Sequence, residues 1–195
     1  MKPSFMRTGR VSDSALYRRI EFALYAQTQT IIMSHIHELI DWVVSVYIVK
    51  DGKVLLVRHK QLGMWLPIGG HVELDEDPEQ ALFREVEEEC GLEIELIGSA
   101  KPSLNDPISK PLPTPAFIDI HKISPKHRHI VLVYVARSKS GDPKLAEKEH
   151  HDIRWFSRVD LRKKEFGLLP AIIFYAESAL KMDEYIEKSK EFIGR

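Results

Sequence analysis

The chain has 195 residues, of which 44% are hydrophobic and 29% are charged, a composition typical of one folded domain with a substantial core. Its formal net charge of −1 excludes an overall basic field for nucleic acid, and its single cysteine excludes an intramolecular disulfide framework. No apolar run is long enough to span a bilayer, and the basic N-terminus lacks the apolar core of a signal peptide. We therefore expect a cytoplasmic protein that binds neither DNA nor a membrane.

Residues 1–32 differ in pattern from the rest and predict an N-terminal extension. Ser12 or Asp13 can cap a helix that begins at Ala15. This extension is either a helix that packs on the body or on a second subunit of a homodimer, or the product of an alternative translational start. Residues 33–195 are assigned to a single domain.

Two strands joined by a tight turn are predicted next. Residues 42–49 have the alternating side-chain pattern of a strand and are rich in β-branched side chains. Residues 54–58 return as the partner strand. Asp51-Gly52 between them is the strongest short hairpin signal. A loop over residues 61–64 then leads towards an acidic segment, which runs from Gly69 to Leu92.

The acidic segment carries the signals of one ordered helix. Asp77 can serve as N-cap and Pro78 suits the first helical position. Gln80 completes a capping-box spacing with Asp77, and Gly91 supplies a C-terminal stop. We predict a single helix between Pro78 and Gly91.

The acids of this helix gather on one side. At 100° per residue, Glu85, Glu88 and Glu89 fall within about 100° of one another. Such carboxylates repel at i,i+3 and i,i+4 spacing, unless oxygen ligands converge on a hard divalent cation such as Mg²⁺ or Mn²⁺. A solvated acidic face is the simpler alternative. The neighbouring arc, which we expect to face the core and to bury the thiol, consists of Leu82, Phe83, Val86 and Cys90.

The segment resembles, position by position, the box of the Nudix hydrolase family. The resemblance implies an α/β/α sandwich around a mixed β-sheet, in which the box forms a loop, a helix and a second loop. It also implies metal-dependent hydrolysis of a phosphoanhydride in a nucleoside diphosphate linked to another moiety. The matching residues are Gly70, Glu76, Arg84-Glu85-Val86, Glu88-Glu89 and Gly91-Leu92.

The same resemblance implies roles for individual residues. Arg84 and Glu76 match a pair that generally orients the loop and the helix. Ile68 stands where the family commonly has a proline, from which we expect local loop variation and not loss of activity. The residues that match the ligands of Mg²⁺ or Mn²⁺ are Glu85, Glu88, Glu89 and, through its carbonyl, Gly69.

The chain after the box is predicted to complete the sheet and to end in a long helix. Residues 100–115 contain five prolines and predict a long substrate loop, and residues 138–152 predict a second active-site loop. The regular elements expected here are strands at 93–97, 117–123, 129–136 and 153–157, a helical turn at 159–161, and a helix from Pro170 towards Phe192 whose Tyr and Phe side chains pack in the core.

Several residues outside the box are candidates for the site. The family often recruits a further acid from a later loop, and of Glu147 and Glu149 we favour Glu149 as a catalytic carboxylate. His150-His151 is either a metal or base contact or a solvated pair. The candidates for contact with substrate phosphates are Arg58 and His129, the latter within His127-Arg128-His129.

The sequence does not decide which nucleotide is the substrate. Pro107 lies where the branch that hydrolyses ADP-ribose commonly has a proline, but its proline-rich surroundings give the match little weight. A (d)NTP pyrophosphatase is as well supported as a nucleotide-sugar hydrolase. The alternatives are a non-catalytic nucleotide-sensing module, which the retained acids disfavour, and an mRNA-decapping hydrolase, which the neutral charge disfavours.

Overall fold

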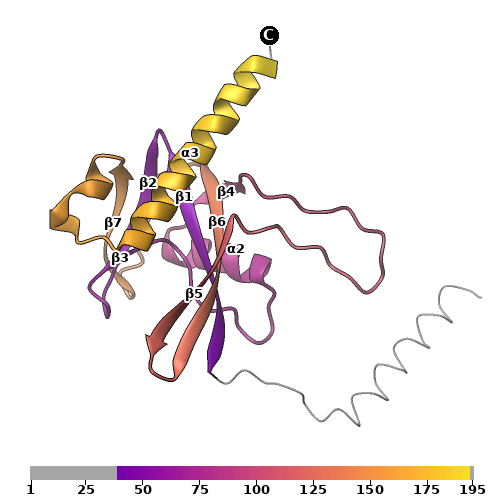
Figure 1. The fold of residues 1–195 in the computed structure, drawn as a ribbon, viewed down its shortest axis with the longest axis horizontal. Coiled ribbons are helices and arrows are strands. Elements are labelled where there is room, and N and C mark those ends of the chain that lie inside the picture. Colours follow the sequence, from indigo (N-terminus) through magenta and orange to yellow (C-terminus); the bar gives the residue numbers. More distant parts are fainter. Residues whose placement is uncertain (1–38, 194–195) are drawn as a thin grey trace, which may run out of the picture. The chain divides into compact units, whose positions relative to one another are not determined.

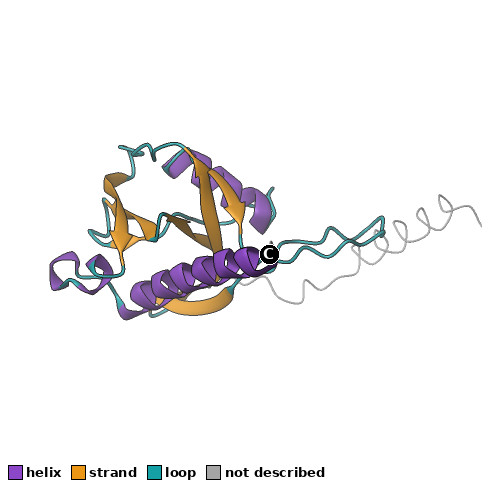
Figure 2. Ribbon diagram, turned by 90° about the horizontal axis from the view of Figure 1, so that it is seen from above, coloured by secondary structure: helices purple, strands orange, loops and turns teal. Residues whose placement is uncertain are grey.

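A mixed β-sheet between two helices forms the body of the protein, and the structure, a computed structural model, describes residues 39–193. The predicted extension over residues 1–32 lies outside these residues. Helix α2 (Pro78–Glu89) covers one face of the sheet and helix α3 (Pro170–Ile193) covers the other (Figures 1 and 2). This arrangement confirms the predicted α/β/α sandwich.

The sheet has seven strands, ordered β3-β2-β1-β6-β4, with β5 on β6 and β7 on β2. Strands β1 and β6 are parallel, and the other pairs of strands are antiparallel. The long parallel pairing runs down the centre of the fold. The strands are β1 (Ile40–Lys50), β2 (Lys53–His59), β3 (Trp65–Leu66), β4 (Glu93–Leu96), β5 (Phe117–Ser124), β6 (His127–Ser140) and β7 (His150–Ser157), and two 3-10 turns, η1 (Asp160–Arg162) and η2 (Lys164–Phe166), precede α3.

Successive side chains of β1 point to opposite faces of the sheet and pack in two separate cores. Val46 and Ile48 pack with Leu82 of α2, whereas Tyr47 and Val49 belong to the core beneath α3. Successive side chains of a strand point to opposite faces, so a strand with apolar residues at every position is buried on both sides. The apolar run predicted as a strand is therefore the middle of the sandwich.

The β1–β2 hairpin confirms its sequence signal. Lys50 pairs with Lys53 across the turn, and both intervening residues have positive φ, 48° at Asp51 and 69° at Gly52. Two consecutive residues with positive φ define the type I′ turn, whose twist matches that of the flanking strands.

Two expectations about side-chain burial are wrong. Phe83 is 44% exposed, because Ala81, Leu82 and Val86 make the helix contact with the sheet and Phe83 points away from it. On α3, Tyr175 packs against Phe117, but the aromatic residues nearer the C-terminus are exposed. The last turns of α3 run past the strands (Figure 1), so they have no sheet to cover.

The two predicted loops differ in how well they match the structure. Residues 97–116 contain no helix or strand and form a long excursion between β4 and β5 (Figure 1), as the prolines predict. The second loop is shorter than expected and spans residues 141–149, because β6 extends to Ser140 and β7 already begins at His150. No helix within residues 39–193 is long and apolar enough to cross a membrane.

Candidate active site

Helix α2 is closed at both ends by the residues that the sequence singles out. Asp77 Oδ1 accepts from the amides of Glu79 (2.9 Å) and Gln80 (3.1 Å), and Gln80 Oε1 accepts from the Asp77 amide at 3.0 Å. At the other end, Gly91 has φ 60° and its amide donates to the Val86 carbonyl at 2.9 Å. The reciprocal capping box and the left-handed glycine set where the acidic helix begins and ends.

The loop before α2 lies against β1 through two glycines. The carbonyls of Ile68 and Gly70 accept from the amides of Val46 (2.8 Å) and Val44 (2.9 Å). A Cβ on Gly69 would lie 2.2 Å from the Val44 carbonyl oxygen, so only glycine fits there. The Gly69 carbonyl receives no backbone hydrogen bond from residues 39–193, and its oxygen can therefore serve as a ligand.

The box carboxylates differ in burial. Glu85 is 9% exposed and Glu89 is 5% exposed, whereas Glu88 is exposed. The Gly69 amide donates to Glu89 Oε2 at 3.1 Å, which joins the helix to the loop. Burial raises the pKa of Glu85, and the neighbouring Glu89 and Glu88 add to that effect. Two buried carboxylates on adjacent helical turns are unfavourable unless a cation compensates them.

Arg84 supplies part of that compensation and holds the acids in place. Its Nε and Nη2 donate to the two oxygens of Glu76 at 3.0 and 2.7 Å, and its Nη1 donates to Glu85 (2.8 Å) and Glu88 (3.0 Å). Nη2 also donates to the His71 carbonyl at 3.0 Å. The hydrogen bonds from Arg84 lower the pKa of Glu76, and this guanidinium orients the box loop relative to the helix.

Glu89 lies beside a histidine from the far end of the chain. His150 Nε2 is 3.0 Å from Glu89 Oε1, and the His150 side chain is 1% exposed. Neither ring nitrogen of His150 makes a hydrogen bond with the described residues. One oxygen of Glu149 lies within 4.8 Å of a carboxylate oxygen of Glu89 and of a ring nitrogen of His150. The structure thus brings the favoured loop acid, Glu149, to the box carboxylates.

The remaining candidates lie elsewhere. Arg58 is exposed near the end of β2, where it pairs across the sheet with Asp152, and no contact to the box carboxylates is found for it in the described part of the chain. His129 faces Asp41 and His127 instead.

His151 is solvent-exposed, but His150 is not, so the interpretation of a solvated pair is wrong for His150. No periodic signal in the sequence marks His150 as buried.

The donor set fits a hard divalent cation. Among residues 39–193, no Lys or Arg pairs with Glu89, although its side chain is only 6% exposed. Glu85 shares the single guanidinium of Arg84 with two other carboxylates. Carboxylate and carbonyl oxygens are the ligands that Mg²⁺ and Mn²⁺ prefer, and the buried negative charge calls for such an ion.

Comparisons with known proteins agree with this geometry. A family model described as a NUDIX domain matches residues 40–174. The CTP pyrophosphohydrolase of Escherichia coli is 47% identical over an alignment of 55 residues, and the match covers 26% of this chain and 41% of that protein. The chain therefore spans less than half the length of this curated relative.

Two solved structures share the fold over most of the described chain. The crystal structure of a NUDIX-family hydrolase from Clostridium perfringens has a TM-score of 0.61 and 34% identity, and covers 72% of this chain and 96% of its own. The MutT NUDIX hydrolase from Burkholderia pseudomallei has a TM-score of 0.53 and 26% identity, with 74% and 98% covered.

Proposed function

Since the chain belongs to the Nudix hydrolase family, we propose that it cuts a phosphoanhydride bond of a nucleoside triphosphate with the help of Mg²⁺ or Mn²⁺. The observation that carries this proposal is the pair of buried carboxylates, Glu85 and Glu89, beside the Gly69 carbonyl. Only one cationic side chain, Arg84, reaches the described carboxylates of this cluster. A non-catalytic nucleotide-sensing module would not need to keep buried carboxylates whose charge Arg84 compensates only in part.

The residues of the site divide into ligands, a base and a positioning group. Glu85, Glu88, Glu89 and the Gly69 carbonyl hold the ion, which when bound neutralises phosphate oxygens and lowers the pKa of a ligated water. Glu149 is the general base that takes the proton of the attacking water, because it is the exposed carboxylate beside Glu89. The exposed position of Glu149 lets it meet both water and substrate.

Arg84 is a positioning residue. Its guanidinium contacts Glu85, Glu88 and Glu76 at once. It therefore fixes the orientation of the Glu85 and Glu88 carboxylates before substrate binds. A fixed constellation of ligands lowers the cost of ordering the site during the reaction.

Nucleoside triphosphates are the first substrates to test. One curated relative is named a CTP pyrophosphohydrolase, and one of the similar crystal structures is named a MutT NUDIX hydrolase. ADP-ribose and nucleotide sugars are cut at the same kind of bond and form the comparison group. The proposal predicts higher kcat/KM for a triphosphate than for either of these.

The decisive experiment measures phosphate, pyrophosphate and nucleoside monophosphate released from a panel of NTPs, dNTPs, ADP-ribose and nucleotide sugars. Each substrate is assayed with Mg²⁺, with Mn²⁺ and with EDTA. We expect release of monophosphate and pyrophosphate from at least one triphosphate, and its loss with EDTA. The absence of release from every compound would favour the nucleotide-sensing alternative.

A matched pair of variants tests the ligand assignment. Glu88→Gln removes a carboxylate charge from the cluster but leaves an oxygen that can still accept from Arg84, so the fold is expected to persist. Turnover should fall by orders of magnitude. Glu87→Gln changes the adjacent exposed acid and should have near-normal turnover. Near-normal turnover of Glu88→Gln at saturating metal would contradict the assignment.

A further inference from the structure

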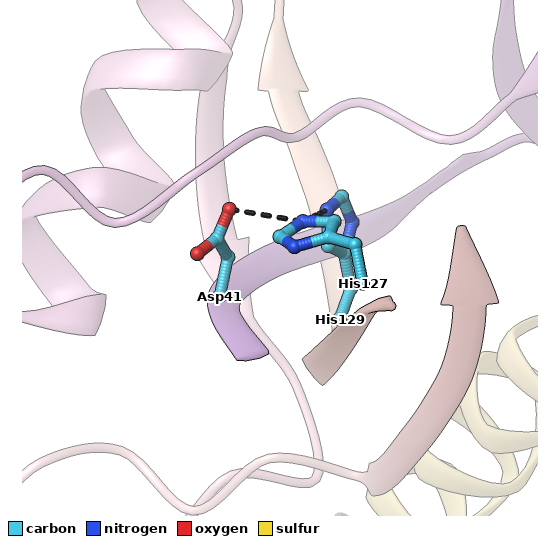
Figure 3. A group of neighbouring side chains, drawn as sticks. All are labelled: Asp41, His127 and His129. Atoms are coloured by element: carbon cyan, nitrogen blue, oxygen red, sulfur yellow. Dashed lines mark hydrogen bonds and ion pairs between the residues drawn. The ribbon is translucent and has the colours of Figure 1, made fainter. Parts of the chain in front are cut away.

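A second cluster of ligand side chains lies at the beginning of β1. Figure 3 shows His127 and His129 close to each other and to Asp41. His127 Nε2 lies 3.1 Å from Asp41 Oδ2 and 3.1 Å from His129 Nε2. One ligand atom from each of these three residues lies within 4.8 Å of the other two. The cluster contains none of the box carboxylates.

The register of the sheet creates this cluster. Asp41 and His129 are directly paired between β1 and β6, and His127 precedes His129 by two residues, so all three side chains project from one face. His71 of the box loop bridges to β1 two residues beyond Asp41 and joins the same face. His71 Nε2 lies 3.5 Å from Asp41 Oδ2, and its ring centroid lies 4.8 Å from that of His129.

Hydrogen bonding satisfies both contacts of His127 only if one hydrogen is shared between two acceptors. A single imidazole nitrogen carries either one hydrogen or one lone pair. If the His127 Nε2 hydrogen faces Asp41, it must be shared with the lone pair of His129 Nε2, and if His127 Nε2 accepts from His129, its lone pair faces a carboxylate. A cation placed among the three ligand atoms is attracted by every lone pair at once.

We propose that Asp41, His127 and His129 bind a divalent transition-metal ion such as Zn²⁺, with the box-loop His71 as the fourth ligand. Zn²⁺ bound to imidazole at about 2.0–2.1 Å in a tetrahedron has ligand atoms about 3.3–3.4 Å apart. Three of the six ligand separations are 3.1 Å (Asp41 to His127), 3.1 Å (His127 to His129) and 3.5 Å (His71 to Asp41), which are close to those tetrahedral edges. His71 lies outside the group of ligand atoms that are all within 4.8 Å of one another, so it must move closer to complete the tetrahedron.

The balance of ligands distinguishes this site, where imidazoles predominate, from the box, where His150 stands among several carboxylates. Imidazole nitrogens favour Zn²⁺, Ni²⁺ or Cu²⁺, whereas Mg²⁺ selects oxygen donors. The ligands come from β1, β6 and the box loop, so a bound ion ties these three segments together. The His71 carbonyl accepts from Arg84, and the ion therefore also stabilises the loop that Arg84 orients.

The test is equilibrium binding of Zn²⁺ to the full chain, in excess Mg²⁺ so that the box carboxylates are occupied. We expect one Zn²⁺ per chain, at least about tenfold weaker binding in the double variant His127→Ala/His129→Ala and in Asp41→Asn, and no change in His151→Ala, which removes an exposed histidine outside the cluster. Zn²⁺ should also raise the thermal unfolding midpoint of the wild type but not that of the double variant.

Substitution with Co²⁺ supplies an independent readout, because a four-coordinate Co²⁺ ion absorbs visible light more strongly than a six-coordinate one. A strong band in the wild type that disappears in Asp41→Asn supports the site. Metal-free unfolding curves of the variants establish that they fold. Zinc binding that is equal in wild type and double variant, or absent from the wild type, would overturn the proposal.

Discussion

Gly70→Ala offers a sharp test of how the box loop positions Glu85, a proposed metal ligand. A Cβ on Gly70 would lie 2.3 Å from Glu85 Oε1 and 2.7 Å from its Cδ, whereas ordinary contacts begin at 3.4 Å. The Glu85 carboxylate must therefore move by about 1 Å, and such a misplacement of a catalytic group costs about 100-fold in rate. Gly70 does not have a positive φ, so alanine fits its backbone conformation.

The same substitution at the preceding glycine has a different expected outcome. A Cβ on Gly69 would lie 2.2 Å from the Val44 carbonyl oxygen, which is backbone in the central strand and cannot rotate away. Gly69 also has φ 146°, a value that side-chain-bearing residues rarely adopt. Gly69→Ala should therefore lose more folding stability than Gly70→Ala, whose clash is with the end of a side chain.

The assay combines turnover at saturating metal with thermal unfolding for wild type and both variants. We expect Gly70→Ala to lose about 100-fold in turnover with an overpacking cost below about 3 kcal/mol, and Gly69→Ala to unfold at a clearly lower temperature. Turnover of Gly70→Ala within about threefold of wild type would refute the reasoning, since Glu85 would then act from a displaced position.

Three further predictions concern the box helix. Asp77→Ala removes the N-cap that Gln80 reciprocates, and should lower the free energy of unfolding by about 1 kcal/mol in urea titrations. Glu76→Ala leaves the guanidinium of Arg84 without its bidentate partner and should cost about 1.5–3 kcal/mol in the same titration. Burial raises the pKa of the Cys90 thiol to about 11, so thiol reagents should not modify the native protein at pH 8 but should modify it in denaturant. Equal rates in both conditions would contradict the burial of this thiol.

Local signals account for the features that could be read from the sequence. The capping residues of α2, the Asp51-Gly52 turn and the alternation of β1 all act between neighbouring residues. Each of these features can therefore be predicted without knowing the rest of the fold. Helical spacing likewise places Glu85, Glu88 and Glu89 on one side, where either solvent or a divalent cation can compensate their charge.

Helical spacing does not say how far each side of a helix is buried. Phe83 lies in the apolar arc of α2 but is exposed, whereas Glu85 and Glu89 are buried. The contacts of α2 with the sheet decide this, and they are made with residues of β1 and β6 that are distant in the chain.

Contacts between distant strands were decided only by the tertiary structure. His150 meets Glu89 because β7 pairs with β2, and His129 meets Asp41 because β6 pairs with β1. A shift of either register by one residue would turn these side chains to the opposite face. By itself the sequence therefore determined the acidic helix and the clustering of its carboxylates, while the long-range register decided which histidines stand beside it and which form a second cluster.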